Sequence, residues 1–169
     1  MSLVETVMVL TVLLLALSGF LRAMLGATHL NRSNETTAIA MEALRTELER
    51  ISGEPFAELF VRYNDNPADD PALGTSPGKD FAIAGLDPTP DDPDGLPGEI
   101  LFPLGAGAGT LSETTGDFPG LPRDLNLDGD AADADVTADH VLLPIVVRAR
   151  WRDSAGMHTV EFRSLLVER

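Results

Sequence analysis

The chain contains no cysteine among its 169 residues. This absence excludes a disulfide framework, a thiolate metal site and a cysteine nucleophile. No serine or threonine stands in a G-x-S-x-G motif, and no phosphate-binding loop is present, so two common catalytic patterns are missing as well. Proline is also absent from the N-terminal third, because all 12 prolines lie at or beyond Pro55. The sequence therefore does not predict an enzyme, and it leaves the N-terminal third free to form an uninterrupted helix.

Positive charge is scarce in the middle of the chain. Residues 55–139 carry 18 acidic and three basic residues, so this segment alone accounts for the net charge of −15. Such a surface repels phosphates and anionic lipid headgroups, whereas it suits cation binding or solubility. No basic stripe interleaved with aromatic residues is present, so we expect no nucleic-acid partner.

The N-terminal run MSLVETVMVLTVLLLALSGFLRAMLG is the longest apolar stretch. Between Glu5 and Arg22 there are 16 residues without charge, which is near the lower limit for a membrane-spanning helix and longer than a typical signal-peptide core. A carboxylate inside such a segment is costly, so Glu5 needs either a neutralising partner or water at the membrane surface. Glycine weakens a helix, so Gly19 and Gly26 are the points where local unwinding is easiest.

After Arg22 the apolar residues recur mostly at steps of three and four, which predicts one face of an amphipathic helix. This face comprises Leu30, Met41, Leu44, Leu48 and Ile51. The stretch Ser52-Gly53-Glu54-Pro55 then predicts the end of the helix, because glycine favours the left-handed closing residue and proline prevents continuation. We therefore expect a transmembrane or filament-core half at residues 1–27 and an amphipathic half at residues 28–53.

The remaining residues, 54–169, are expected to form a loop-rich antiparallel β domain. Short apolar runs at residues 56–63, 81–86 and 99–104 are interpreted as short strands between proline- and glycine-rich loops. Residues 141–153 and 157–168 both alternate in hydropathy around a Ser-Ala-Gly turn, which predicts a hairpin with Trp151 on its buried face. The predicted fold class is α+β, with a long helix packed on a small antiparallel sheet.

One motif indicates a metal-binding site. The stretch DLNLDGDAADAD, residues 124–135, fits the calcium-loop pattern D-x-[DN]-x-D-G with an acidic residue at position 12. We expect side-chain oxygens from the first three ligand positions, a carbonyl from the fourth and a closing carboxylate, with Asp133 and Asp139 in reserve; the expected metal ligands are Asp124, Asn126, Asp128, Asp130, Asp133 and Asp135. The alternative is a solvated acidic turn.

The loop departs from the full calcium pattern in two ways. Position 12 is Asp135 rather than glutamate, and the residues that follow predict a strand rather than an exiting helix. The motif therefore favours a lone structural calcium loop over a helix-loop-helix sensor. His140 is expected at a strand edge rather than on the metal. The triplets beginning at Asn31 and Asn34 match the N-glycosylation pattern, but both lie on the predicted helix rather than in a surface loop. They are interpreted as chance matches unless the source glycosylates filaments, a point that stays open.

Met1-Ser-Leu-Val-Glu5, followed by an apolar helix that becomes amphipathic and by a small sheet domain, resembles type IV pilins and the related type II secretion pseudopilins. The resemblance implies that a prepilin peptidase exposes Met1, that Met1 is methylated, and that Glu5 neutralises the N-terminal amine of a neighbouring copy. It also implies a homopolymeric filament, built by a pilus assembly machinery, with no enzymatic activity. The subunit would reside in the inner membrane before assembly and afterwards in an extracellular filament or periplasmic pseudopilus.

Two departures accompany this resemblance. Many pilins have a proline near position 22 and a C-terminal disulfide, whereas this chain has Arg22 and no cysteine. The calcium loop could replace the disulfide, as in the pseudopilins that bind calcium there. The alternatives are a pseudopilin or minor tip subunit and, in another class, a monomeric membrane-anchored calcium-binding domain. The purpose of the filament stays open.

Overall fold

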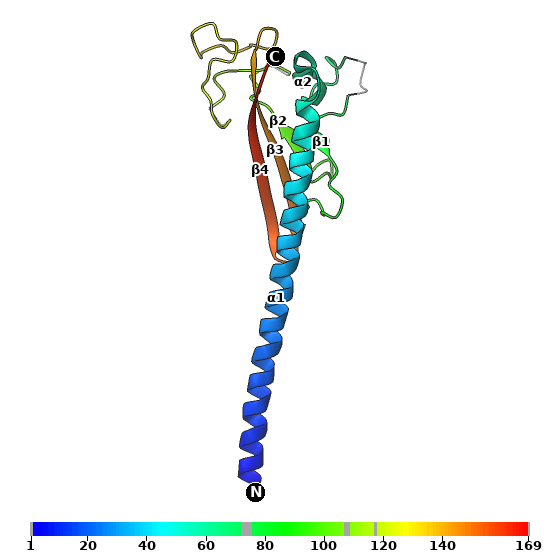
Figure 1. Cartoon of the computed structure of the whole chain (residues 1–169), viewed down its shortest axis with the longest axis vertical. Helices are drawn as coiled ribbons and strands as arrows, with labels where there is room; N and C mark the ends of the chain where they lie inside the picture. Colours follow the sequence, from blue (N-terminus) through cyan, green and yellow to red (C-terminus); the bar gives the residue numbers. More distant parts are fainter. Residues whose placement is uncertain (1, 72–75, 107–108, 117, 169) are drawn as a thin grey trace. The chain divides into compact units, whose positions relative to one another are not determined.

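The computed structural model describes residues 2–71, 76–106, 109–116 and 118–168 (Figure 1). Its elements are the helices α1 (Leu3–Ser52) and α2 (Phe56–Tyr63) and the strands β1 (Asp80–Phe81), β2 (Gly98–Leu101), β3 (Leu142–Asp153) and β4 (Gly156–Val167). The chain divides into two compact units, Met1–Ala38 and Ile39–Arg169.

The first unit consists of the N-terminal part of α1. Its apolar side chains are exposed on every side of the helix, as Leu15 at 68% and Phe20 at 64% illustrate. Both Gly19 and Gly26 are α-helical, so the unwinding that the glycines would permit is not present. An 18-residue window in α1 has a mean hydropathy of 2.2 and no buried residue. By length and composition this helix could cross a membrane, a property that it shares with signal sequences.

In the second unit, the last turns of α1 supply part of the hydrophobic core. Ala40, Leu44 and Ile51 are fully buried, and Leu48 packs against them. The predicted apolar face was wrong at two positions, because Leu30 is 68% exposed and Met41 is 46% exposed. Successive helical residues are about 100° apart, so a face centred on Ala40 and Leu44 turns Met41 towards solvent.

The sheet is a meander in the order β1-β2-β3-β4, with every neighbouring pair antiparallel. The predicted hairpin is confirmed as β3–β4, in which Arg150 lies opposite Thr159 and Asp153 lies opposite Gly156 at the turn. One face of β3 is buried against the core, and its residues are Leu143, Ile145, Val147, Ala149 and Trp151. The structure thus confirms an α+β fold in which a helix packs on an antiparallel sheet.

The apolar run at residues 56–63 is helix α2, so its interpretation as a strand was wrong. Leu59, Phe60 and Tyr63 are buried, and this spacing of one and three residues places them on one helical face. Arg62 forms an ion pair with Glu58 one turn earlier at 2.8 Å. The predicted strand at residues 99–104 is present in shorter form as β2, whereas the one at residues 81–86 shares only Phe81 with β1, so most of that prediction was wrong.

Candidate metal-binding loop

The acidic loop, defined here as residues 124–139, is fixed to the sheet domain by apolar and backbone contacts. Leu125 and Val136 are buried near its two ends. The carbonyl oxygen of Leu125 accepts hydrogen bonds from the N–H groups of Val141 and Leu142, each at 2.9 Å, just where β3 begins. The N–H of Val136 donates to the carbonyl of Leu111 at 2.8 Å. These anchors hold both ends of the loop while its aspartates remain near the surface.

Between these anchors, the aspartate and asparagine side chains fold the backbone into successive tight turns. The N–H of Asp128 donates to Asn126 Oδ1 at 3.2 Å, and the N–H of Asp130 donates to Asp128 Oδ1 at 3.0 Å. Gly129 has φ +107° and donates its N–H to Asp124 Oδ2 at 3.0 Å. A left-handed residue is needed at this turn, and glycine adopts it without steric cost.

Glu113 lies outside the motif and yet belongs to the same site. It is fully buried, and its Oε1 accepts a hydrogen bond from the N–H of Leu125 at 2.5 Å. Its Oε2 accepts a second from the N–H of Asp133 at 3.2 Å. A buried carboxylate is costly unless it is hydrogen-bonded or paired with a cation, and these two N–H groups meet part of that requirement.

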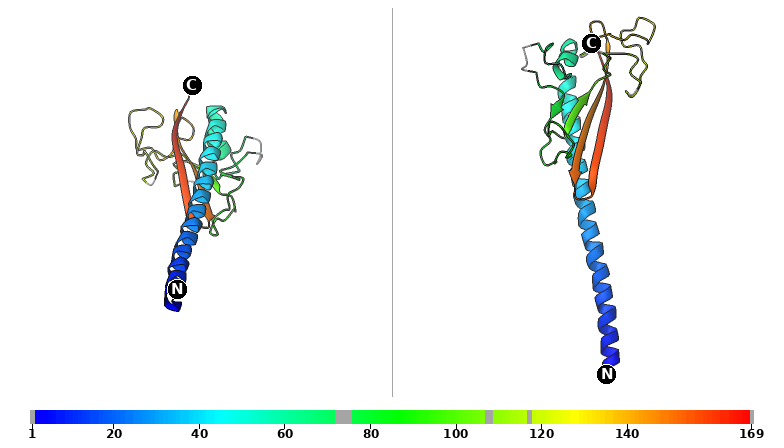
Figure 2. Two further views of the ribbon diagram at one scale, coloured as in Figure 1. Left: turned by 60° about the horizontal axis from the view of Figure 1, so that its bottom comes forward. Right: turned by 180° about the vertical axis from the view of Figure 1, so that it is seen from behind.

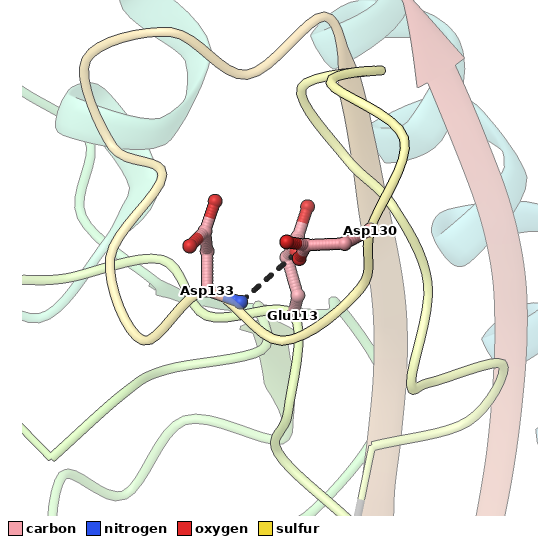
Figure 3. A group of neighbouring side chains, drawn as sticks. All are labelled: Glu113, Asp130 and Asp133. Atoms are coloured by element: carbon pink, nitrogen blue, oxygen red, sulfur yellow. Dashed lines mark hydrogen bonds between the residues drawn. The ribbon is translucent and has the colours of Figure 1, made fainter.

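Glu113, Asp130 and Asp133 form an acidic triad, with one carboxylate oxygen from each lying within 4.8 Å of the others. Figure 3 shows the carboxylate of Glu113 beside that of Asp130, with the dashed line marking its bond to the backbone of Asp133. Glu113 is buried, Asp133 half-buried and Asp130 exposed. Hard divalent cations prefer carboxylate oxygens, so this triad could hold a metal ion.

The electrostatics distinguish Asp133 from Asp135. Loss of solvent raises the pKa of Asp133, and the neighbouring carboxylates of Asp128, Asp130 and Glu113 raise it further. A bound cation would remove this repulsion. By contrast, hydrogen bonds from the hydroxyl and N–H of Thr137 lower the pKa of Asp135.

Of the six predicted ligands, the triad contains Asp130 and Asp133. Asp130 takes part through its carboxylate, whereas the motif predicts its carbonyl. The four predicted ligands outside the triad are Asp124, Asn126, Asp128 and Asp135. Among the described residues Asp124 Oδ1 is buried and has no hydrogen-bond partner, and Asp128 contributes charge near Asp133. Both therefore have oxygens that a cation could recruit.

Sequence reasoning missed Glu113 because it precedes the motif by 11 residues. His140 is not part of the triad. Its ring lies 5.3 Å from that of Phe56, and its Nδ1 is 3.1 Å from the carbonyl oxygen of Thr137.

The second predicted site is at the N-terminus. Met1 lies outside the described residues. Glu5 is exposed in the first turn of α1, where its N–H donates to the carbonyl of Ser2 at 3.0 Å. A carboxylate in the first turn interacts favourably with the helix dipole, so Glu5 also has a local stabilising role.

No model of a known protein family matches the sequence, and no curated protein or solved structure matches it either.

Proposed function

We propose that the chain is the structural subunit of a pilus-like filament, assembled through its N-terminal helix in the manner of type IV pilins. The main support is the composition of α1. Residues 3–21 are apolar on all sides with Glu5 as the single charged residue, and the last turns of α1 pack against an antiparallel sheet. Such a chain has an apolar segment that requires lipid or other helices around it, and a folded unit that buries its own apolar core.

The apolar segment fits a membrane before assembly and a bundle of helices afterwards. Residues 3–21 would span roughly 28 Å as a helix, close to the thickness of a hydrocarbon core. This segment projects large apolar side chains on all sides, and none of its described residues is buried. Helices of other copies could replace lipid around these side chains because both environments are apolar.

In this proposal, Glu5 sets the axial position of one copy relative to its neighbour. In a bundle, its carboxylate would pair with the N-terminal amine of a neighbouring copy, which neutralises both charges as lipid and water are excluded. A displaced neighbour would leave the carboxylate buried and unpaired, which is strongly unfavourable. The pair therefore favours one axial position between copies.

The acidic loop supports a structural cation in the same subunit. A calcium ion at Glu113, Asp130 and Asp133 would tie residues 124–139 to the segment that precedes them, which is the role a disulfide has in many pilins. The same triad favours a second candidate, a monomeric membrane-anchored calcium-binding domain. The two functions differ in whether Glu5 is needed.

The test is Glu5→Lys in producing cells, with Glu35→Lys as a control that reverses an exposed acid further along α1. Membrane fractionation measures insertion, and electron microscopy of sheared material measures filaments. We expect Glu5→Lys to remain in the membrane and to abolish filaments, while Glu35→Lys retains them. Normal filaments from Glu5→Lys would refute the register role, and a wild-type chain that forms none would favour the anchored domain.

A further inference from the structure

The outer face of the β3–β4 hairpin carries a row of arginines. Side chains alternate along a strand, so Arg148, Arg150 and Arg152 point away from the face that buries Ala149 and Trp151. Arg163 of β4 lies opposite Val146 and shares the outer face. We call Arg148, Arg150, Arg152 and Arg163 the arginine face.

Carboxylates near this face neutralise it only in part. Arg148 binds Glu99 Oε2 at 2.6 Å, and Arg150 lies 4.0 Å from the same oxygen. Arg163 pairs with Glu161 at 3.1 Å. The backbone of Asp87 bridges to Arg152, but within the described part of the chain no carboxylate lies within 4.0 Å of the Arg152 guanidinium. Within ion-pair distance the four arginines thus share two glutamates, Glu99 and Glu161, and the carboxylate of Asp92 also lies near Arg150.

The acidic loop carries an excess of negative charge. It contains six aspartates and no basic residue between Asp124 and Asp139. None of these carboxylates forms an ion pair with a described basic side chain. Asp128, Asp135 and Asp139 are exposed and lie outside the acidic triad, so they remain available even if the triad holds a cation.

Arg150 and Arg152 cannot pair with the acidic loop within one copy, whereas Arg163, opposite Val146, lies nearer to it. The acidic loop joins the sheet at Leu142, whereas Arg150 and Arg152 are eight and ten residues further along β3. At about 3.3 Å per residue, these positions are roughly 26 and 33 Å from the loop end of the hairpin. Figures 1 and 2 show the loop near the C-terminus and the β3–β4 turn at the opposite end of the hairpin. A second copy, displaced along the strand direction, could bring the surfaces together.

We propose that the arginine face of one copy binds the acidic loop of the next copy. The two surfaces are different, so the contact is heterologous, and each copy keeps one unused surface at either end. Repetition gives an open chain of copies rather than a closed dimer. The inference rests on the proposed filament function, to which it adds a contact between the sheet domains.

The absence of native cysteine allows a direct test with the full chain in its membrane. Ala138→Cys places a thiol in the acidic loop, and Thr159→Cys places one opposite Arg150, both at exposed positions. A bifunctional maleimide with a short spacer should join these positions between copies and give a ladder of multimers from the double variant. A control double variant, Thr159→Cys with Ala84→Cys, also has two exposed thiols but lacks the one in the loop, so we expect no ladder.

Charge reversal then tests whether the contact is ionic. Arg152→Glu in the double-cysteine chain should lower the yield of cross-linked multimers roughly three- to tenfold, because attraction is replaced by repulsion. Arg45→Glu changes the net charge equally at an exposed arginine of α1 and should leave the yield unchanged. Adding Asp139→Arg to Arg152→Glu should restore part of the ladder. Equal loss in both single reversals would overturn the proposal.

The outcome can be separated from that of the filament proposal by microscopy of the same cells. Filaments without a ladder would overturn the contact and leave the filament function intact. A salt-sensitive ladder without filaments would support the contact while the filament function fails.

Discussion

Glu113→Gln is the substitution that best tests the acidic loop as a cation site. The Glu113 carboxylate is fully buried and holds the loop through hydrogen bonds to the N–H groups of Leu125 and Asp133. Glutamine has nearly the same shape, but only one of its two terminal groups can accept a hydrogen bond. The substitution therefore removes a carboxylate from the triad and disturbs one of the two backbone contacts.

The two effects can be separated by their dependence on calcium. A cation at 100 times its dissociation constant stabilises the folded state by about 2.7 kcal/mol, which corresponds to a rise in Tm on the order of 10 °C for a domain of this size. Losing a hydrogen bond to a buried charged group costs about 1–3 kcal/mol, with or without calcium. We expect wild type to gain about 10 °C from calcium and Glu113→Gln to lose most of that gain.

The assay is thermal unfolding of the full chain in detergent, with calcium or with chelator. Fluorescence of Trp151 reports on the sheet domain, because it is the sole tryptophan and is 1% exposed. Asp91→Asn is the matched control, since it removes an exposed acid from another acidic loop and should leave the calcium effect unchanged. The cation site would be refuted by a wild-type Tm that is the same in calcium and chelator, or by a full calcium effect in Glu113→Gln.

Two further predictions concern the sheet domain. Leu44→Ala should lower the free energy of unfolding by about 2–5 kcal/mol in chemical denaturation, because Leu44 is fully buried, whereas the exposed Met41→Ala should change it by less than about 0.5 kcal/mol; similar losses would contradict the assigned helix face. Asp80 has its pKa raised to about 6, first by loss of solvent and then by a hydrogen bond with Asp94. The folded state therefore binds a proton more tightly than the unfolded state, so this group favours folding below the unfolded pKa and loses that contribution as the pH rises through about 6. Asp80→Asn should flatten this decline in Tm between about pH 4 and pH 7, and an unchanged pH profile would contradict it.

Hydropathy patterns predicted the elements whose burial is regular. The hairpin was predictable because apolar and arginine residues alternate in β3 from Val147 to Arg152, and α1 was predictable because no proline interrupts it before Pro55. Helix α2 was not, because eight residues in a proline-rich context are too few to separate a helical from a strand period. Its identity depends on tertiary burial of Leu59, Phe60 and Tyr63.

The candidate cation site was likewise predictable only where it depends on local sequence. Spacing within residues 124–135 predicted tight turns around Gly129, because these depend on local backbone geometry and on side chains two residues away. Spacing could not reveal Glu113, because its approach depends on the packing of a separate segment, nor the turn of the Asp130 carboxylate towards it. Local sequence fixed the shape of the loop, and the rest of the domain selected which carboxylates meet.

Because the cation would bind only some of the aspartates in the acidic loop, it competes little with the proposed contact between copies. A divalent cation at Glu113, Asp130 and Asp133 would neutralise mainly the charge of these three carboxylates. The exposed Asp128, Asp135 and Asp139 would keep their charge unless the cation recruits Asp128 as well. Cation binding should also hold the backbone that presents these residues, which lowers the entropy lost when another copy binds. The same loop can thus be stabilised by calcium and still attract an arginine face, provided that the two functions use different aspartates.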